Sequence, residues 1–133
     1  MTTKFITCRD VMNQRYEFAD GIMTVSAALK LMREKNITKV IINRRDNSDE
    51  FGMVELSDIA KKVIGKDRAP DRVNLYEIMT KPSITVRPEM NIKYCARLFD
   101  QYMLASAIVI ENEEVIGVVS YNDIVLSWID IFE

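Results

Sequence analysis

The residues with the clearest chemical potential form a Ser-x-x-Asp motif near the C-terminus. Ser120 and Asp123 lie three positions apart, after the apolar run Val115–Val119 and at the start of an apolar, helical segment. A serine and an acidic residue at this spacing form a capping box, in which each side chain accepts a hydrogen bond from the other residue's backbone N–H. The motif therefore predicts a helix N-terminus that displays one hydroxyl and one carboxylate.

Residues for most enzymatic chemistry are missing from the sequence. The chain contains no histidine, which removes the commonest general base, the Ser-His triad and most zinc sites. It shows no nucleophile–base pair, metal cluster or phosphate-cradling glycine loop, so we predict no enzyme, no catalytic residue, no metal site and no catalytic cofactor. Cys8 and Cys95 lie far apart and form no CxxC motif, which fits a reducing compartment. Cys95 falls on the apolar face of a predicted helix and is expected in the core.

The overall composition is ordinary for a soluble globular protein, since 48% of the 133 residues are hydrophobic and 29% are charged. The net charge of -2 gives no electrostatic signal for nucleic acid. Met1–Phe5 lacks the apolar segment of a signal peptide, and no apolar run approaches the roughly 18 residues that span a bilayer. We therefore expect a cytoplasmic protein without nucleic-acid or membrane partners.

The segment that carries the Ser-x-x-Asp motif has a counterpart in the first half of the chain. Gly117–Ile124 matches Gly52–Ile59, and the apolar positions before these segments recur in the same order. We therefore predict two repeats, the first at residues 1–66 and the second at residues 67–133. The polar turn Arg44–Glu50 accommodates the extra residues of the first repeat.

Both repeats are predicted to contain the same elements. In each, a helix begins at a capping residue, Thr24 or Asn91, and a buried strand, a return strand and a second helix follow. The predicted ranges are strands 40–42, 51–54, 83–86, 107–110 and 115–119, and second helices 56–64 (ended by Gly65 as its C′ residue) and 121–132. The fold class is α/β (α+β): tandem β-α-β-β-α repeats that bury their apolar sheet faces by packing about a pseudo-twofold axis.

The ordered set of motifs resembles a family. Ile78–Pro82, Ile84–Val86, Ala107–Ile110 and Gly117–Ile124, in this order, look like one CBS repeat, and the first half looks like a more divergent copy. The resemblance covers residues 9–125 and identifies a stand-alone CBS-domain pair, or Bateman module. It implies binding of AMP, ADP, ATP, S-adenosylmethionine or a related adenosyl ligand in clefts between the repeats. It also implies regulation of a partner protein and pairing of two modules into a homodimer.

In the resembled family, the Asp of this motif accepts hydrogen bonds from ribose hydroxyls, and the Ser hydroxyl and helix N-terminus face phosphate. The resemblance thus implies a main site at Ser120 and Asp123, and capping remains the alternative role for this pair. The first repeat would contribute Phe18, Ile37, Thr38 and Lys39. Lys39 could reach a phosphate as a point charge, or could simply be a solvated residue at a strand edge.

The resemblance implies a second site at Asp58, which differs from the main site in one residue. Glu55 stands where the family has Ser or Thr, and its carboxylate would repel a phosphate. The neighbours of Asp58 from the second repeat would be Ile84, Thr85, Leu104 and Ala105. We expect at most one good phosphate site, and the Asp58 site is either empty or accepts a ligand that lacks phosphate.

Two functions remain open from the sequence. The first is a sensory module that binds an adenosyl ligand and signals in trans to an effector protein. The alternative is a structural dimerisation or adaptor module that binds no ligand. The last predicted helix is apolar nearly all round, so part of it, including Trp128, is expected at a dimer or partner interface.

Overall fold

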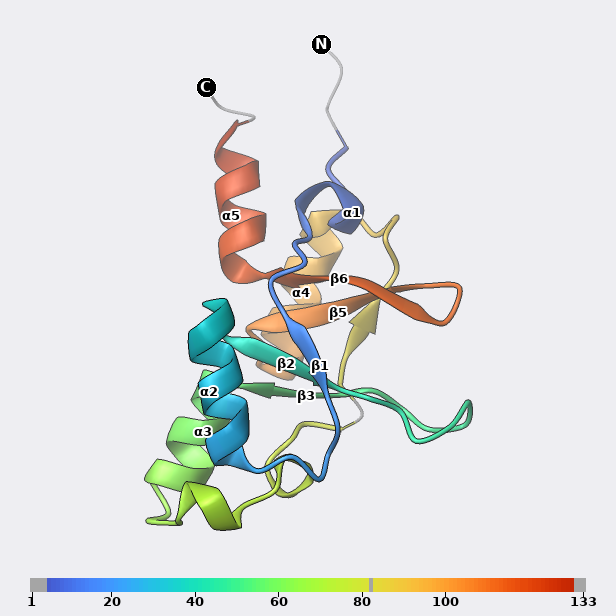
Figure 1. Cartoon of the computed structure of the whole chain (residues 1–133). Coiled ribbons are helices and arrows are strands. Elements are labelled where there is room, and N and C mark those ends of the chain that lie inside the picture. Colours follow the sequence, from blue (N-terminus) through green and yellow to red (C-terminus); the bar gives the residue numbers. More distant parts are fainter. Residues whose placement is uncertain (1–4, 82, 131–133) are drawn as a thin grey trace. The chain divides into compact units, whose positions relative to one another are not determined.

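The computed structural model describes residues 5–81 and 83–130, and Figure 1 traces the chain in order. Each half contains the order strand, helix, strand, strand, helix, which confirms the predicted α/β class and the tandem β-α-β-β-α repeats. The elements are α1 (Cys8–Val11), β1 (Glu17–Ala19), α2 (Val25–Lys35), β2 (Lys39–Ile42), β3 (Gly52–Glu55), α3 (Leu56–Ile59) with its π-helical continuation η1 (Ala60–Ile64), the 3-10 turns η2 (Pro70–Arg72) and η3 (Leu75–Glu77), β4 (Thr85–Val86), α4 (Ile92–Tyr102), β5 (Ser106–Glu111), β6 (Glu114–Ser120) and α5 (Tyr121–Ile129).

Two compact units divide the chain at other points than the sequence repeats. The first unit comprises residues 15–83, and the second comprises residues 1–14 together with residues 84–133. As a result, Cys8 and Val11 of α1 belong to the core of the second unit, and Leu75 of η3 belongs to the core of the first. Each repeat therefore completes its core with the short helical segment that precedes the other repeat's first strand.

In the first unit, β2 is the central strand of a sheet ordered β1-β2-β3. β1 pairs with β2 in parallel and β3 pairs with it antiparallel. The apolar run Val40–Ile42 is buried at every position, as expected for a strand covered on both faces. Thr24 caps α2 as predicted, because its Oγ1 accepts a hydrogen bond of 3.1 Å from the Ala27 N–H.

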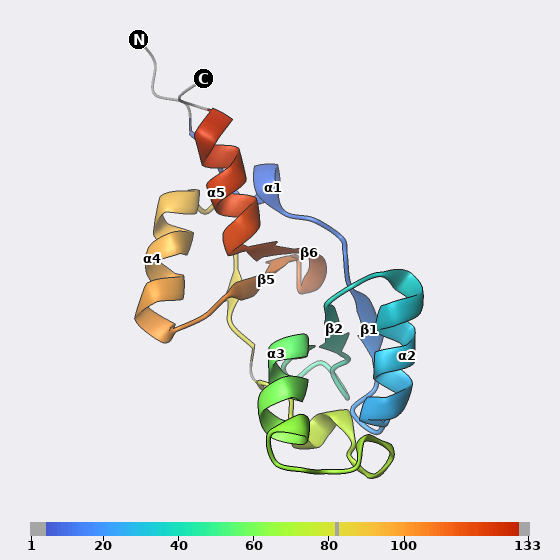
Figure 2. The same cartoon turned by 90° about the vertical axis from the view of Figure 1, so that its left-hand side faces the viewer.

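The second unit repeats this arrangement in a sheet ordered β4-β5-β6, with α4 and α5 beside it in Figure 2. Asn91 caps α4 as predicted, since its Oδ1 accepts a hydrogen bond of 2.9 Å from the Lys93 N–H. Phe99 of α4 is fully buried and meets the Tyr121 ring of α5 edge-on, with ring centroids 5.3 Å apart. This contact joins α4 to α5.

Cys8 and Cys95 meet in the core of the second unit, although they are 87 positions apart in the chain. Both are fully buried, which confirms the core position expected for Cys95. A hydrogen bond to Cys8, together with burial, raises the pKa of the Cys95 thiol well above its usual range. The Cys95 thiol therefore stays protonated at neutral pH and packs as a small apolar group.

The second helix of each repeat ends differently from the sequence-based prediction. Gly65 has a φ of -67°, so it is not a left-handed C′ residue. Its N–H donates to the Ala60 carbonyl at 2.8 Å, and a Cβ there would lie 3.0 Å from the Lys61 carbonyl oxygen. Glycine thus fits the π-helical turn because carbonyl groups crowd the position. The final helix ends at Ile129, and the predicted residues 131 and 132 lie outside the described part of the chain.

The surface of α5 combines one buried and several exposed apolar residues. Ile124 packs into the core. The exposed apolar side chains, each with about half or more of its area accessible, are Val125, Leu126, Trp128 and Ile129. Among residues 5–81 and 83–130, no helix has the length and apolar character to cross a membrane.

Candidate ligand site

The Ser-x-x-Asp motif lies where β6 ends and α5 begins. The Ser120 N–H donates to Asp123 Oδ2 at 2.8 Å, and the Asp123 N–H donates to Ser120 Oγ at 3.4 Å. The predicted capping box is therefore present. Because both side chains are partly buried here, the cap also fixes the positions of the hydroxyl and the carboxylate.

The Asp123 carboxylate is held mainly through one of its oxygens. Oδ2 accepts from the Ser120 N–H, from Ser120 Oγ at 2.9 Å and from Asn13 Nδ2 at 2.9 Å. None of the side-chain hydrogen bonds found for Asp123 in the described part of the chain uses Oδ1. This oxygen retains the capacity to accept hydrogen bonds from a ligand hydroxyl.

The neighbouring strand adds a second hydroxyl. Ser106 begins β5 directly opposite Ser120 and is 6% exposed. Beside it, the Ala105 carbonyl accepts from the Tyr121 N–H at 3.2 Å. We refer to Asn13, Ser106, Ser120 and Asp123 as the hydroxyl corner, where Asp123 is the one charged member.

The equivalent position of the first unit carries opposite charges instead of hydroxyls. Lys39 begins β2 opposite Glu55, as Ser106 stands opposite Ser120, and Lys39 Nζ lies 4.0 Å from a Glu55 carboxylate oxygen. Asp58 Oδ2 accepts from the Glu55 N–H at 2.8 Å, and Asp58 Oδ1 lies 3.5 Å from Lys62 Nζ. We refer to Lys39, Glu55, Asp58 and Lys62 as the ion-pair corner.

The sequence suggests that Lys39 is either a phosphate-binding charge or a solvated residue, whereas the structure shows it beside Glu55. Its side chain is only 15% exposed, and Nζ lies close to Glu55 and donates to Thr38 Oγ1 at 3.4 Å. Lys39 is thus neither a freely solvated residue nor a cation without a counter-charge. A phosphate that used Lys39 would compete with the Glu55 carboxylate.

Of the other first-unit residues predicted for the main site, Ile37 and Thr38 lie just before β2, whereas Phe18 is in the middle of β1. Thr38 precedes β2, and its carbonyl accepts from the Leu56 N–H at 3.2 Å. Ile37 follows the end of α2, where its N–H donates to the Met32 carbonyl at 2.9 Å. Phe18 lies in β1 opposite Ile41, and 45% of its area is exposed.

The second-unit residues predicted for the Asp58 site lie in two segments of that unit. Thr85 pairs with Ile108 in β5, as Phe18 pairs with Ile41, so Phe18 and Thr85 are equivalent in strand register. Ile84 precedes Thr85 directly, and its carbonyl accepts from the Ile108 N–H at 3.1 Å. Leu104 and Ala105 line a cavity of about 380 Å³ together with Phe99 and Tyr121 of the flanking helices. Each predicted site combines residues of both units. The contacts described for these residues lie within a single unit.

Sequence reasoning missed two residues that hold the carboxylates. Asn13 binds Asp123 from the far end of the chain, and no pattern around Asn13 indicates this contact. Lys62 binds Asp58 from four positions later on the same helical stretch. The spacing of Asp58 and Lys62 is the i, i+4 signal that could have identified that pair.

The comparisons with known proteins identify the family of the chain. The CBS domain model matches residues 1–65 and again residues 75–129. A curated relative, an uncharacterised protein of Methanopyrus kandleri, is 34% identical over 95 residues, which are 70% of this chain and 47% of that protein. The chain spans about half the length of the curated relatives it matches first.

Solved structures show the same fold. The hexameric CBS-CP12 protein from bloom-forming cyanobacteria is 36% identical, with a TM-score of 0.87 over 90% of this chain and 69% of that one. The CBS domain pair of protein MJ0100, solved in complex with 5′-methylthioadenosine and S-adenosyl-L-methionine, is 21% identical, with a TM-score of 0.78 over 96% of this chain and 98% of that one. With two matches of the family model over two copies of the β-α-β-β-α repeat, the chain belongs to the CBS domain family and contains a pair of CBS domains.

Proposed function

We propose that this CBS pair is a regulatory module that binds one adenosyl ligand through the hydroxyl corner and signals to a partner protein in trans. The candidate ligands are AMP, ADP, ATP, S-adenosylmethionine and 5′-methylthioadenosine. Phe18, Ile37, Thr38 and Lys39 of the first repeat would contribute to the same site. The effector protein would respond to a change in the module, which requires that the ligand has different affinities for two of its states.

The observation that carries the proposal is the arrangement of the Asp123 carboxylate. Three hydrogen bonds to Oδ2 fix the group, whereas Oδ1 is used by none of the side-chain hydrogen bonds that Asp123 makes within residues 5–81 and 83–130. A carboxylate of this kind can accept from the two vicinal hydroxyls of a ribose. The adjacent N-terminus of α5 and the Ser120 hydroxyl favour an anionic group such as phosphate.

An adenosyl ligand is also supported by analogy with a protein of the same fold. The MJ0100 pair shares the fold and was solved with two adenosyl compounds. The exposed apolar side chains on α5 support the further proposal that two modules form a homodimer through this helix.

A second candidate function is a structural dimerisation or adaptor module that binds no ligand. The ion-pair corner favours it, because Glu55 and Lys39 fill with their own charges the place that corresponds to Ser120 and Ser106. If the hydroxyl corner were also without a ligand, the exposed face of α5 would be the functional surface.

Thermal unfolding with each adenosyl compound separates the two functions. A ligand at 100 times its dissociation constant stabilises the folded protein by about 2.7 kcal/mol. We expect at least one compound to raise the melting temperature of the wild type and of Asp58→Ala, but not of Asp123→Ala. No shift with any of the five compounds would favour the adaptor function and contradict the sensory one.

A further inference from the structure

A second cavity lies in the first unit at the opposite end of β2 from Lys39. Its volume is about 740 Å³, which is within the range of small-molecule sites. Ile42 at the end of β2, Tyr76 of η3 and Met79 provide an apolar lining, and Arg44, Arg45 and Lys81 provide positive charge. The cavity thus combines an apolar surface with cations, whereas the ion-pair corner at the other end of the strand is closed by its own charges.

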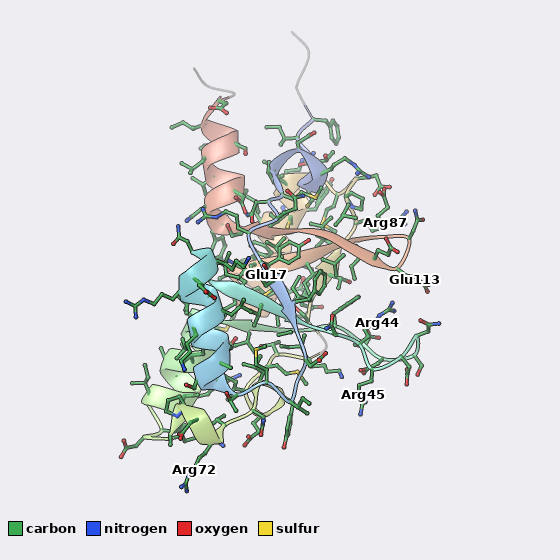
Figure 3. The ribbon with its side chains drawn as sticks, viewed as in Figure 1. Glu17, Arg44, Arg45, Arg72, Arg87 and Glu113 are labelled. Atoms are coloured by element: carbon green, nitrogen blue, oxygen red, sulfur yellow. The ribbon has the colours of Figure 1, made fainter. Side chains whose placement is uncertain are left out.

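The loop that forms one wall is particular to the first repeat. β2 and β3 are joined by residues 43–51, whereas β5 and β6 are joined by Asn112 and Glu113 alone. Figure 3 shows Arg44 and Arg45 on this longer loop. The Arg44 guanidinium lies 4.8 Å from the centroid of the Phe51 ring, which ties the start of the loop to its end.

Lys81 and Arg45 already bind an anion, the carboxylate of Asp49. Lys81 Nζ lies 2.7 Å from Asp49 Oδ1, and Arg45 Nε lies 3.2 Å from Asp49 Oδ2. The Arg45 N–H also donates to Asp49 Oδ2, at 2.9 Å. The Asp49 side chain, 8% exposed, therefore shows that this wall accepts a carboxylate with three donors around it.

The far wall offers polar groups and a rigid turn. Asn43 Nδ2 donates to Asp20 Oδ1 at 3.1 Å, and the Tyr76 N–H donates to the Gly21 carbonyl at 2.9 Å. A Cβ at Gly21 would lie 3.2 Å from the Tyr76 Cβ, so glycine allows η3 to approach the turn after β1. These contacts hold the walls of the cavity in place without filling it.

We propose that this cavity binds a small organic phosphate whose phosphate group displaces the Asp49 carboxylate from Lys81 and Arg45. The apolar body of the ligand packs on Ile42, Tyr76 and Met79. A phosphate fits the donors better than a monoanionic carboxylate, because its two charges match two cations and Arg binds it with a forked pair of N–H groups. Asp49 acts as an internal competitor that must leave the cations before the ligand binds, so occupancy is coupled to the conformation of residues 43–51.

Phenyl phosphate is a suitable probe, with inorganic phosphate and benzoate as comparisons. Amide chemical shifts in a titration of the full chain locate the binding, and we expect Gly21 and Asn43 to respond. We expect phenyl phosphate to bind more tightly than either comparison compound. Lys81→Gln and, separately, Arg45→Gln should weaken it roughly tenfold, since each removes a charged hydrogen bond. Asp49→Asn should strengthen it, because the competing charge is removed.

Controls separate this site from the hydroxyl corner. Arg72→Gln on η2, which Figure 3 shows well away from Arg44 and Arg45, should bind phenyl phosphate like the wild type, and so should Asp123→Ala. Circular dichroism of each variant verifies that it is folded. Equal binding by wild type and Lys81→Gln, equal affinity for benzoate, or shifts confined to Ser120 and its neighbours would overturn the proposal. Loss of adenosyl binding in Asp123→Ala with phenyl phosphate binding intact would leave both proposals standing independently.

Discussion

The hydroxyl corner and the ion-pair corner occupy the same place in two copies of one repeat, yet they differ in charge. In the second repeat, Ser106 faces Ser120 across the strand pair, and in the first, Lys39 faces Glu55. Both carboxylates that follow, Asp123 and Asp58, still accept the N–H of the capping residue. The repeat thus conserves its capping geometry while one copy replaces two hydroxyls by an internal ion pair. The same capped turn therefore supports either a pair of serine hydroxyls or an internal ion pair.

Truncating one buried core residue in each unit should have the largest effect on stability. It tests whether the two cores are equally well packed. Phe99 in the second unit and Met32 in the first are both almost fully buried. Phe99→Ala should cost about 3–5 kcal/mol and Met32→Ala about 2–5 kcal/mol of unfolding free energy, because each leaves a cavity. Urea unfolding measures both values. A cost below about 1 kcal/mol for either variant would show that its unit is loosely packed and that the corners cannot be compared as equivalent sites.

Exchanging the charges of the ion-pair corner tests whether they exclude phosphate. The double variant Lys39→Ser, Glu55→Ser gives the first unit the two serines of the hydroxyl corner. We expect AMP to bind at least tenfold more tightly near Asp58 in this variant, because like charges placed together cost several kcal/mol. Amide shifts of Asp58 during an AMP titration provide the measurement. Unchanged shifts would mean that something other than Glu55 closes this corner.

A smaller effect concerns the caps themselves. Ser120→Ala removes a side-chain acceptor from the start of α5 and should cost about 1 kcal/mol. Glu55→Ala removes the ion pair to Lys39 and should cost less, about 0.5 kcal/mol, because the two charged groups are 4.0 Å apart, at the limit of an ion pair. Chemical denaturation of the two variants gives the comparison. A larger loss for Glu55→Ala would show that the ion-pair corner stabilises its helix start more than the hydroxyl corner does.

The stabilisation that the long loop of the first repeat, residues 43–51, provides should weaken at acidic pH. Hydrogen bonds from Lys81 and Arg45 hold the pKa of Asp49 well below its ordinary value of 3.8. The stabilisation from the Asp49 carboxylate is therefore complete above about pH 4 and is lost as the pH falls below that value. Asp49→Asn should be less stable than the wild type at pH 7, and the difference should shrink at pH 3. The exposed Asp71→Asn, as a control, should show no such convergence, and a difference that is constant with pH would contradict this account.

The apolar pattern determines most of the fold, because buried strands and capped helices depend on local sequence. The run Val40–Ile42 and the caps at Thr24 and Asn91 are local signals, and the structure confirms all three. The exchange of short helical segments between the units is not visible in the sequence, since it depends on which core α1 and η3 fill. The predicted division at residue 66 follows the repeats, whereas the compact units follow the packing.

The candidate site was predictable only in part, for a similar reason. Ser120 and Asp123 are three positions apart, so a local rule predicts their contact. The bond from Asn13 to Asp123 joins residues 110 positions apart, and no local rule applies to it. The pairing of Lys39 with Glu55 follows from strand register, which the first-repeat sequence specifies weakly because its long loop obscures the alignment of β2 and β3.

The stoichiometry of adenosyl binding shows whether one or both of the two equivalent corners bind a nucleotide. Isothermal titration of the wild type with AMP, ATP and S-adenosylmethionine should give one equivalent per chain for at least one of them. That binding should persist in Asp58→Ala and disappear in Asp123→Ala. Two equivalents per chain, or one equivalent that survives Asp123→Ala and disappears in Asp58→Ala, would contradict the account.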